Sequence, residues 1–174
     1  MLAALERRHF QAAVTHDGVP PTRYHARWVL PITAPPVHDG TVVVHDGRIV
    51  WVGPRASAPD GRDEDLGEAI LMPGLVNAHT HLDLTVMRGF LEGLSFFAWI
   101  RTLTAARAEL RYEDFLASAR LGIVEGLRRG VTTYADTAPS PAGFDAMRKM
   151  GVRGIAYREV FGPAPSQARA AVDE

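Results

Sequence analysis

Residues 73–83 read PGLVNAHTHLD, and no other segment of this 174-residue chain says as much about its architecture. The segment begins with an apolar run and ends in two histidines, His79 and His81, that are separated by one residue. Side chains at positions i and i+2 of an extended strand project from the same face. Because imidazole nitrogen is a common zinc ligand, the two rings are predicted to point the same way and to share one metal ion.

The composition is that of a globular protein, with 47% hydrophobic and 22% charged residues. The net charge of −1 gives no support for a nucleic acid or an acidic membrane as partner. No apolar segment reaches the roughly 18 residues that a membrane span needs. The chain has no cysteine, which excludes disulfides and thiolate metal ligands from it. We therefore expect a cytoplasmic protein without a nucleic-acid or membrane partner.

The first part of the chain is predicted to be rich in strands. Residues 1–22 are interpreted as an N-terminal extension with a weak helix over 2–14. A short strand is expected at 26–30, and Asp46-Gly47 is a two-residue hairpin signal between strands at 41–45 and 48–52. Residues 55–68 are polar and interrupted by glycine and proline, which predicts a loop before a short strand at 69–72.

After the histidines the pattern predicts alternating helices and strands. Ser95 is a candidate N-cap for a helix with apolar residues at helical spacing, and a second helix begins near Glu113 and ends at Gly130. A strand at 131–135, a helix at 144–150, a strand at 152–160 and the start of a helix at 166–174 follow. Such alternation indicates parallel strands joined by crossovers, so an open doubly wound sheet and a closed barrel both fit.

The place of the histidines favours the barrel. No glycine-rich phosphate-binding pattern follows the first strand, which removes the main support for a nucleotide-binding sheet. Ligands at the C-terminal end of the first strand suit a barrel, because barrel enzymes carry their chemistry at that face.

Residues 73–83, followed by Met87-Arg88-Gly89 and Trp99, resemble the amidohydrolase superfamily. The similarity is to the branch of cytosine, guanine, S-adenosylhomocysteine and aminofutalosine deaminases and of triazine chlorohydrolases. It extends from residue 24 to about residue 165. The resemblance implies an α/β fold in which residues 73–174 form the first βα units, about three, of an incomplete TIM-like (β/α)₈ barrel. It also implies that residues 23–72 form part of a small β-sandwich.

The same resemblance implies a function. A metal-dependent hydrolase of this branch acts on C–N bonds other than peptide bonds, and metal-bound hydroxide deaminates an aromatic nitrogen heterocycle similar to a purine nucleoside. We expect one divalent metal ion, zinc first and iron second, and a small-molecule substrate. A chlorohydrolase or a cyclic-amide hydrolase on the same scaffold stays open, as does a non-catalytic truncated remnant.

Five residues carry the predicted site. His79 and His81 are the metal ligands, while Asp83, Trp99 and Glu159 are candidates for substrate binding. Each of the last three has a structural alternative: a capping acid for Asp83, core packing for Trp99 and a buried ion pair for Glu159. Two further residues receive structural roles, because Asp136 is expected to bind loop amides and Arg88 to form a salt bridge.

The remaining functional groups are missing from the chain. The resemblance implies further histidines after strands five and six, an aspartate after strand eight and a glutamate proton shuttle. No histidine lies beyond His81, and every other histidine precedes residue 46. A complete barrel takes about 250 residues. We therefore expect an incomplete portion of an enzyme, inactive alone, with its catalytic residues downstream and with a homo-oligomer or a completing chain as candidate partners.

Overall fold

The computed structural model describes residues 19–160 and Arg169. The chain divides into two compact units, residues 1–73 and residues 74–174. The helices predicted at 2–14 and 166–174 fall outside the described residues, apart from Arg169. Among the residues that the structure describes, no helix combines the length and the apolarity needed to cross a bilayer.

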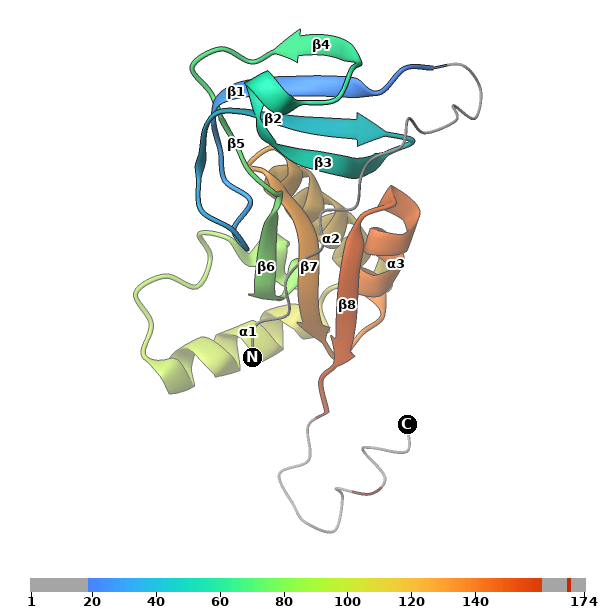
Figure 1. Cartoon of the computed structure of the whole chain (residues 1–174). Helices are drawn as coiled ribbons and strands as arrows, with labels where there is room; N and C mark the ends of the chain where they lie inside the picture. The colour runs from blue at the N-terminus through green and yellow to red at the C-terminus, as the bar shows by residue number, and fades with distance from the viewer. Residues whose placement is uncertain (1–18, 161–168, 170–174) are drawn as a thin grey trace. The chain divides into compact units, whose positions relative to one another are not determined.

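The first unit is a five-stranded sheet built around β1, Thr22–Val29 (Figure 1). β1 pairs in antiparallel fashion with β2, Val37–His45. It pairs in parallel with β4, Arg62–Asp65, and with β5, Ile70–Leu71. β2 pairs with β3, Arg48–Pro54. The predicted hairpin is confirmed, because Asp46 and Gly47 form the turn with φ values of 49° and 67°. Such left-handed backbone at both positions is what the type I′ turn of a two-residue hairpin requires.

One expectation for this unit is wrong. The segment 55–68, predicted as a loop, contains a 3-10 turn at Arg55–Ser57 and the strand β4 at Arg62–Asp65. All four residues of β4 are charged and exposed. Its sequence therefore lacks the apolar alternation by which a strand is predicted. The strand is held by its ladder with β1 and by Asp63, which accepts a hydrogen bond from Nε2 of the buried His25 at 2.8 Å.

The second unit contains a parallel sheet in the order β6-β7-β8. The strands are β6, Leu75–Thr80; β7, Val131–Ala138; and β8, Arg153–Arg158. A short helical segment η3, Leu82–Met87, follows β6 and leads to the helices α1, Phe96–Ala108, and α2, Tyr112–Leu127. α3, Ala142–Met150, connects β7 to β8. The predicted α/β class with parallel βα units is therefore confirmed.

The helix ends follow local signals with one exception. Ser95 stands at the N-cap of α1, as predicted, but its side chain makes no capping hydrogen bond. At the start of α2, the Asp114 carboxylate accepts a hydrogen bond from the backbone N–H of Arg111 at 2.9 Å. α3 begins two residues earlier than predicted and ends at Gly151, whose φ of 67° lies in the left-handed region.

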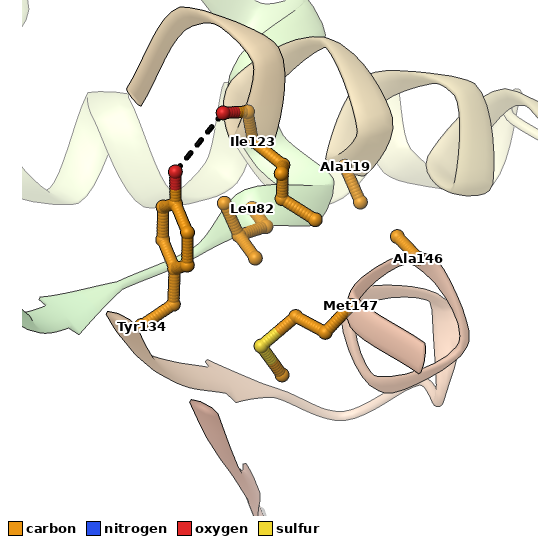
Figure 2. Packing of buried hydrophobic residues seen from close by; sticks show 6 residues of the cluster. All are labelled: Leu82, Ala119, Ile123, Tyr134, Ala146 and Met147. Carbon is orange, nitrogen blue, oxygen red and sulfur yellow. Dashed lines mark hydrogen bonds between the residues drawn. The ribbon is translucent and has the colours of Figure 1, made fainter. Parts of the chain in front are cut away.

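A small apolar core lies between the sheet and its helices (Figure 2). Tyr134 of β7 is 2% exposed, and its hydroxyl donates a hydrogen bond to the Ile123 carbonyl of α2 at 2.9 Å. The other members of the core come from η3, α2 and α3: Leu82, Ala119, Ile123, Ala146 and Met147. Leu82 belongs to this core and directly follows His81, so the packing of η3 fixes the chain where the histidine pair ends.

Candidate metal and substrate site

The two histidines lie at the C-terminal end of β6. Their ring centroids are 5.2 Å apart, and the ring planes are nearly perpendicular, at 88°. His79 is the exposed penultimate residue of the strand, whereas His81 follows it with φ −120° and ψ 82°, outside both strand and helix geometry. The Nδ1 atom of His81 is buried and has no hydrogen-bond partner among the described residues. The structure thus brings the predicted pair together and leaves one ring nitrogen of His81 without a hydrogen-bond partner among these residues.

Two rings do not complete a metal centre. Catalytic zinc usually takes three protein ligands and a water. Within residues 19–160, no group of three or more His, Cys, Asp or Glu side chains is arranged to hold a metal ion. The donor set therefore fits a divalent metal in chemistry, but it needs ligands from outside the described residues.

Asp136 fixes the turn that follows His81. Its carboxylate is 2% exposed, and Oδ1 accepts a hydrogen bond from the backbone N–H of Leu82 at 2.7 Å. This confirms the expectation that Asp136 binds a loop amide. Burial raises the pKa of the Asp136 carboxyl above its ordinary value, while the Leu82 amide opposes that shift. A Cβ atom at Gly143 of α3 would lie 1.8 Å from Oδ2 of Asp136, so only glycine leaves room there for the carboxylate.

Asp83 is completely buried on the first turn of η3. Its Oδ2 accepts a hydrogen bond from Nη2 of Arg107 at 3.2 Å, and its Oδ1 has no partner among the described residues. Burial raises the pKa of the Asp83 carboxyl, and the Arg107 guanidinium acts in the opposite direction. In this structure Asp83 faces an arginine, and its predicted contact with substrate stays a prediction.

Arg107 connects this buried acid to a pocket. The arginine lies in the last turn of α1, and its guanidinium carbon is 5.3 Å from the centroid of the Phe115 ring. The pocket has a volume of ≈ 640 Å³, and its wall includes Arg107, His81, Trp99 and Glu159. The structure therefore groups Trp99 and Glu159 around the same cavity as His81, whereas Asp83 lies behind Arg107.

Arg107 was not among the residues predicted for the site. Trp99, Leu103 and Arg107 recur every four residues, so a helix places them on one face. All three line the pocket. The four-residue spacing predicts that these side chains share one helix face. It does not predict that this face of α1 lies against the same pocket as His81 at the end of β6.

Arg88 has the structural contact that was predicted for it. Its guanidinium donates two hydrogen bonds to the carboxylate of Glu125 on α2, one of them at 2.7 Å and the other shorter. The pair ties the end of η3 to α2 at an exposed position. The carboxylate of Glu125 raises the pKa of Arg88, chiefly through these hydrogen bonds.

Comparisons with known proteins agree on one family. Residues 70–169, more than half of the chain, match the profile of the Amidohydrolase family. The chain is 37% identical over 154 residues to a 5-methylthioadenosine/S-adenosylhomocysteine deaminase of Symbiobacterium thermophilum, covering 84% of this chain and 35% of the relative. The chain thus spans about a third of the length of the curated relatives that it matches.

Solved structures show the same likeness. An adenosine deaminase from Xanthomonas campestris with bound zinc superposes with a TM-score of 0.64 and 28% identity, covering 77% of this chain and 33% of that one. An atrazine chlorohydrolase from Arthrobacter aurescens, complexed with zinc, has a TM-score of 0.70 and 23% identity, covering 84% of this chain and 37% of that one. The second likeness shows the fold alone. By its sequence match and its parallel βα units, the chain belongs to the amidohydrolase family.

Proposed function

We propose that this chain is part of a metal-dependent hydrolase that deaminates an aromatic nitrogen heterocycle, with a purine nucleoside as the substrate class. The observation that carries the proposal is the histidine pair at the end of β6, with rings 5.2 Å apart and one buried ring nitrogen that has no hydrogen-bond partner within residues 19–160. Family membership and the similarity to 5-methylthioadenosine/S-adenosylhomocysteine deaminases support the choice of reaction.

His79 and His81 would hold the metal ion, together with ligands outside the described residues. Zinc is the first candidate, because imidazole nitrogen suits it and because the related adenosine deaminase of Xanthomonas campestris carries zinc. A bound divalent metal would supply an activated water near neutral pH. Iron is the second candidate.

The residues of this chain would bind and orient the heterocycle. Trp99 offers a flat apolar surface at the wall of the pocket, and aromatic faces bind planar rings by offset stacking. Glu159 offers a carboxylate to polar groups of the substrate in the same cavity. Asp83 would act on the substrate through Arg107, which it contacts directly. The proton shuttle and the remaining metal ligands are proposed to lie outside these 174 residues, which would leave residues 1–174 inactive alone.

The test uses the complete protein that contains this chain. Ammonia release is measured on a panel of purine and pyrimidine bases and nucleosides, together with the metal content of each preparation. We expect turnover of a purine nucleoside, and we expect His81→Ala to lower the rate of deamination by more than about 100-fold. Loss of a residue that only supports a metal ligand typically costs 10- to 100-fold, so loss of the ligand itself should cost more. The matched control is His45→Ala, a histidine of the other unit, which should retain turnover. A protein with a filled metal site that releases ammonia from no heterocycle would contradict the deaminase assignment.

A further inference from the structure

Residues 81–83 are held by side chains from two other elements. Asp136 of β7 binds the backbone N–H of Leu82, and Arg107 of α1 binds the carboxylate of Asp83. The Asp136 bond is the shorter of the two, at 2.7 Å against 3.2 Å. It acts on the peptide group that joins His81 to Leu82. A bond to that amide restrains ψ of His81, and this angle helps to set the direction of the imidazole.

His81 needs such a restraint because its backbone is irregular. The strand ends at Thr80, which lies opposite Asp136 in the ladder between β6 and β7. Thr80 is the last residue of β6 in this ladder, and His81 adopts φ −120° and ψ 82°. The side chain of Asp136 thus holds the backbone at Leu82, two residues past the end of β6.

The carboxylate of Asp136 is itself confined. α3 passes so close that a Cβ atom at Gly143 would lie 1.8 Å from Oδ2 of Asp136. The other oxygen, Oδ1, is the acceptor for the Leu82 amide. A side chain at position 143 would therefore move the carboxylate and with it the hydrogen bond. Gly143, Asp136 and the Leu82 amide form a continuous contact from α3 to the turn that carries His81.

We infer that Asp136 is a positioning residue for the metal ligand His81, and that Gly143 provides the clearance that this role requires. The inference rests on the proposed function only in its assignment of a metal to the histidine pair. It makes no use of the substrate. Residues that orient a metal ligand typically contribute 10- to 100-fold to metal affinity. Because Asp136 acts through the backbone rather than on the ring itself, we expect an effect of about 10-fold.

The experiment measures metal binding in the complete protein by competition with a chelator, and the visible absorption spectrum of the Co²⁺-substituted protein. Asp136→Ala should weaken Zn²⁺ affinity by about 10-fold and alter the shape of the Co²⁺ spectrum per bound ion. Asp136→Asn keeps an acceptor oxygen at the same place and should retain the Zn²⁺ affinity and the Co²⁺ spectrum of the wild type. Gly143→Ala retains Asp136 but displaces its carboxylate, so it should reproduce the weaker Zn²⁺ affinity and the altered Co²⁺ spectrum of Asp136→Ala. This second variant tests the inference even if Asp136→Ala does not fold.

The matched control is Tyr134→Phe, two residues earlier on β7. It removes the hydroxyl that donates to the carbonyls of Ile123 and Val131, and neither carbonyl belongs to the turn after His81. A purely structural role for Asp136 would make both variants less stable and leave the affinity and Co²⁺ spectrum of the folded fraction unchanged in each. That result would overturn the inference while leaving the proposed deaminase intact. Absence of metal from the wild-type protein would overturn both, whereas wild-type metal binding without deamination would overturn only the proposed reaction.

Discussion

At the scale of single residues, the pairing of His79 and His81 could be predicted from the sequence, whereas the contacts of the residues around them could not. His79 and His81 lie together because a strand repeats every two residues, a rule that needs no knowledge of the rest of the fold. Asp83 is different, because its carboxylate is completely buried and depends on one arginine for its charge partner. A buried charge that loses its partner retains its full cost of desolvation.

Removing Arg107 should therefore destabilise the second unit. For Arg107→Met we expect a loss of about 3 kcal/mol in the free energy of unfolding, at the lower end for a broken buried pair because Arg107 is 22% exposed. The double variant Arg107→Met/Asp83→Asn should recover most of it, with a coupling of about 1–3 kcal/mol. Urea unfolding of the complete protein measures both. The exposed ion pair between Arg148 and Asp145 is the control, and Arg148→Met should cost far less. A double variant whose loss equals the sum of the losses of Arg107→Met and Asp83→Asn would show that the two residues act independently.

In the first unit, Asp63 makes stability dependent on pH. A hydrogen bond from His25 is the largest influence, and it lowers the pKa of Asp63 below its ordinary value of 3.8. The folded protein therefore holds this proton less tightly than the unfolded chain does. The resulting stabilisation is complete above the unfolded pKa and is lost as the pH falls through the lower folded pKa.

The advantage of wild type over Asp63→Asn should accordingly shrink as the pH falls below about 4. Hydrogen exchange of the amides between β1 and β4 gives a local measurement of this effect. Glu64→Gln, the next residue of β4, controls for the change in net charge. An advantage that stays constant from neutral to acidic pH would rule out the contribution of Asp63.

At the scale of the elements, local signals located the hairpin, both long helices and the parallel strands. Asp46-Gly47 and Gly151 could be interpreted because their backbone angles are those that only a few residue types adopt easily. β4 could not be predicted, since four consecutive exposed charged residues look like a loop and only their pairing with β1 makes them a strand. Arg107 could not be assigned for a related reason, because its role depends on where α1 packs.

The start of β6 offers a test of element packing. A Cβ atom at Gly74 would lie 2.3 Å from Oγ1 and 2.4 Å from Cγ2 of Thr132, so the residue before β6 passes directly over β7. We expect Gly74→Ala to cost about 1–3 kcal/mol of unfolding free energy through overpacking. Thr132→Ala removes both of these atoms, so the double variant should regain part of that loss. Thermal unfolding of the four proteins completes the cycle, and an additive result would show that the two residues do not share this contact.

At the scale of the whole molecule, the parallel sheet leaves apolar side chains in contact with solvent. Leu75 and Val76 of β6 and Ile155 and Tyr157 of β8 are between 47% and 63% exposed. Parallel sheets are normally covered on both faces, and large exposed apolar patches favour association. This chain covers 35% of the Symbiobacterium thermophilum relative, so the remaining residues of that protein would be available to cover such a sheet.

Residues 1–174 expressed alone should therefore associate or bind a hydrophobic dye, whereas the complete protein should do neither. Analytical ultracentrifugation and dye fluorescence at matched concentrations distinguish the two proteins. The prediction fails if residues 1–174 sediment as a monomer and unfold in one sharp, cooperative transition.

The proposed site requires His79 and His81 to bind one metal ion together. Elemental analysis with X-ray absorption at the metal edge, performed on the complete protein, tests it most directly. We predict one divalent ion per chain with imidazole nitrogens among its ligands, lost in both His79→Ala and His81→Ala and retained in His45→Ala. A full equivalent of metal with an unchanged absorption spectrum in both His79→Ala and His81→Ala would show that neither histidine binds the metal.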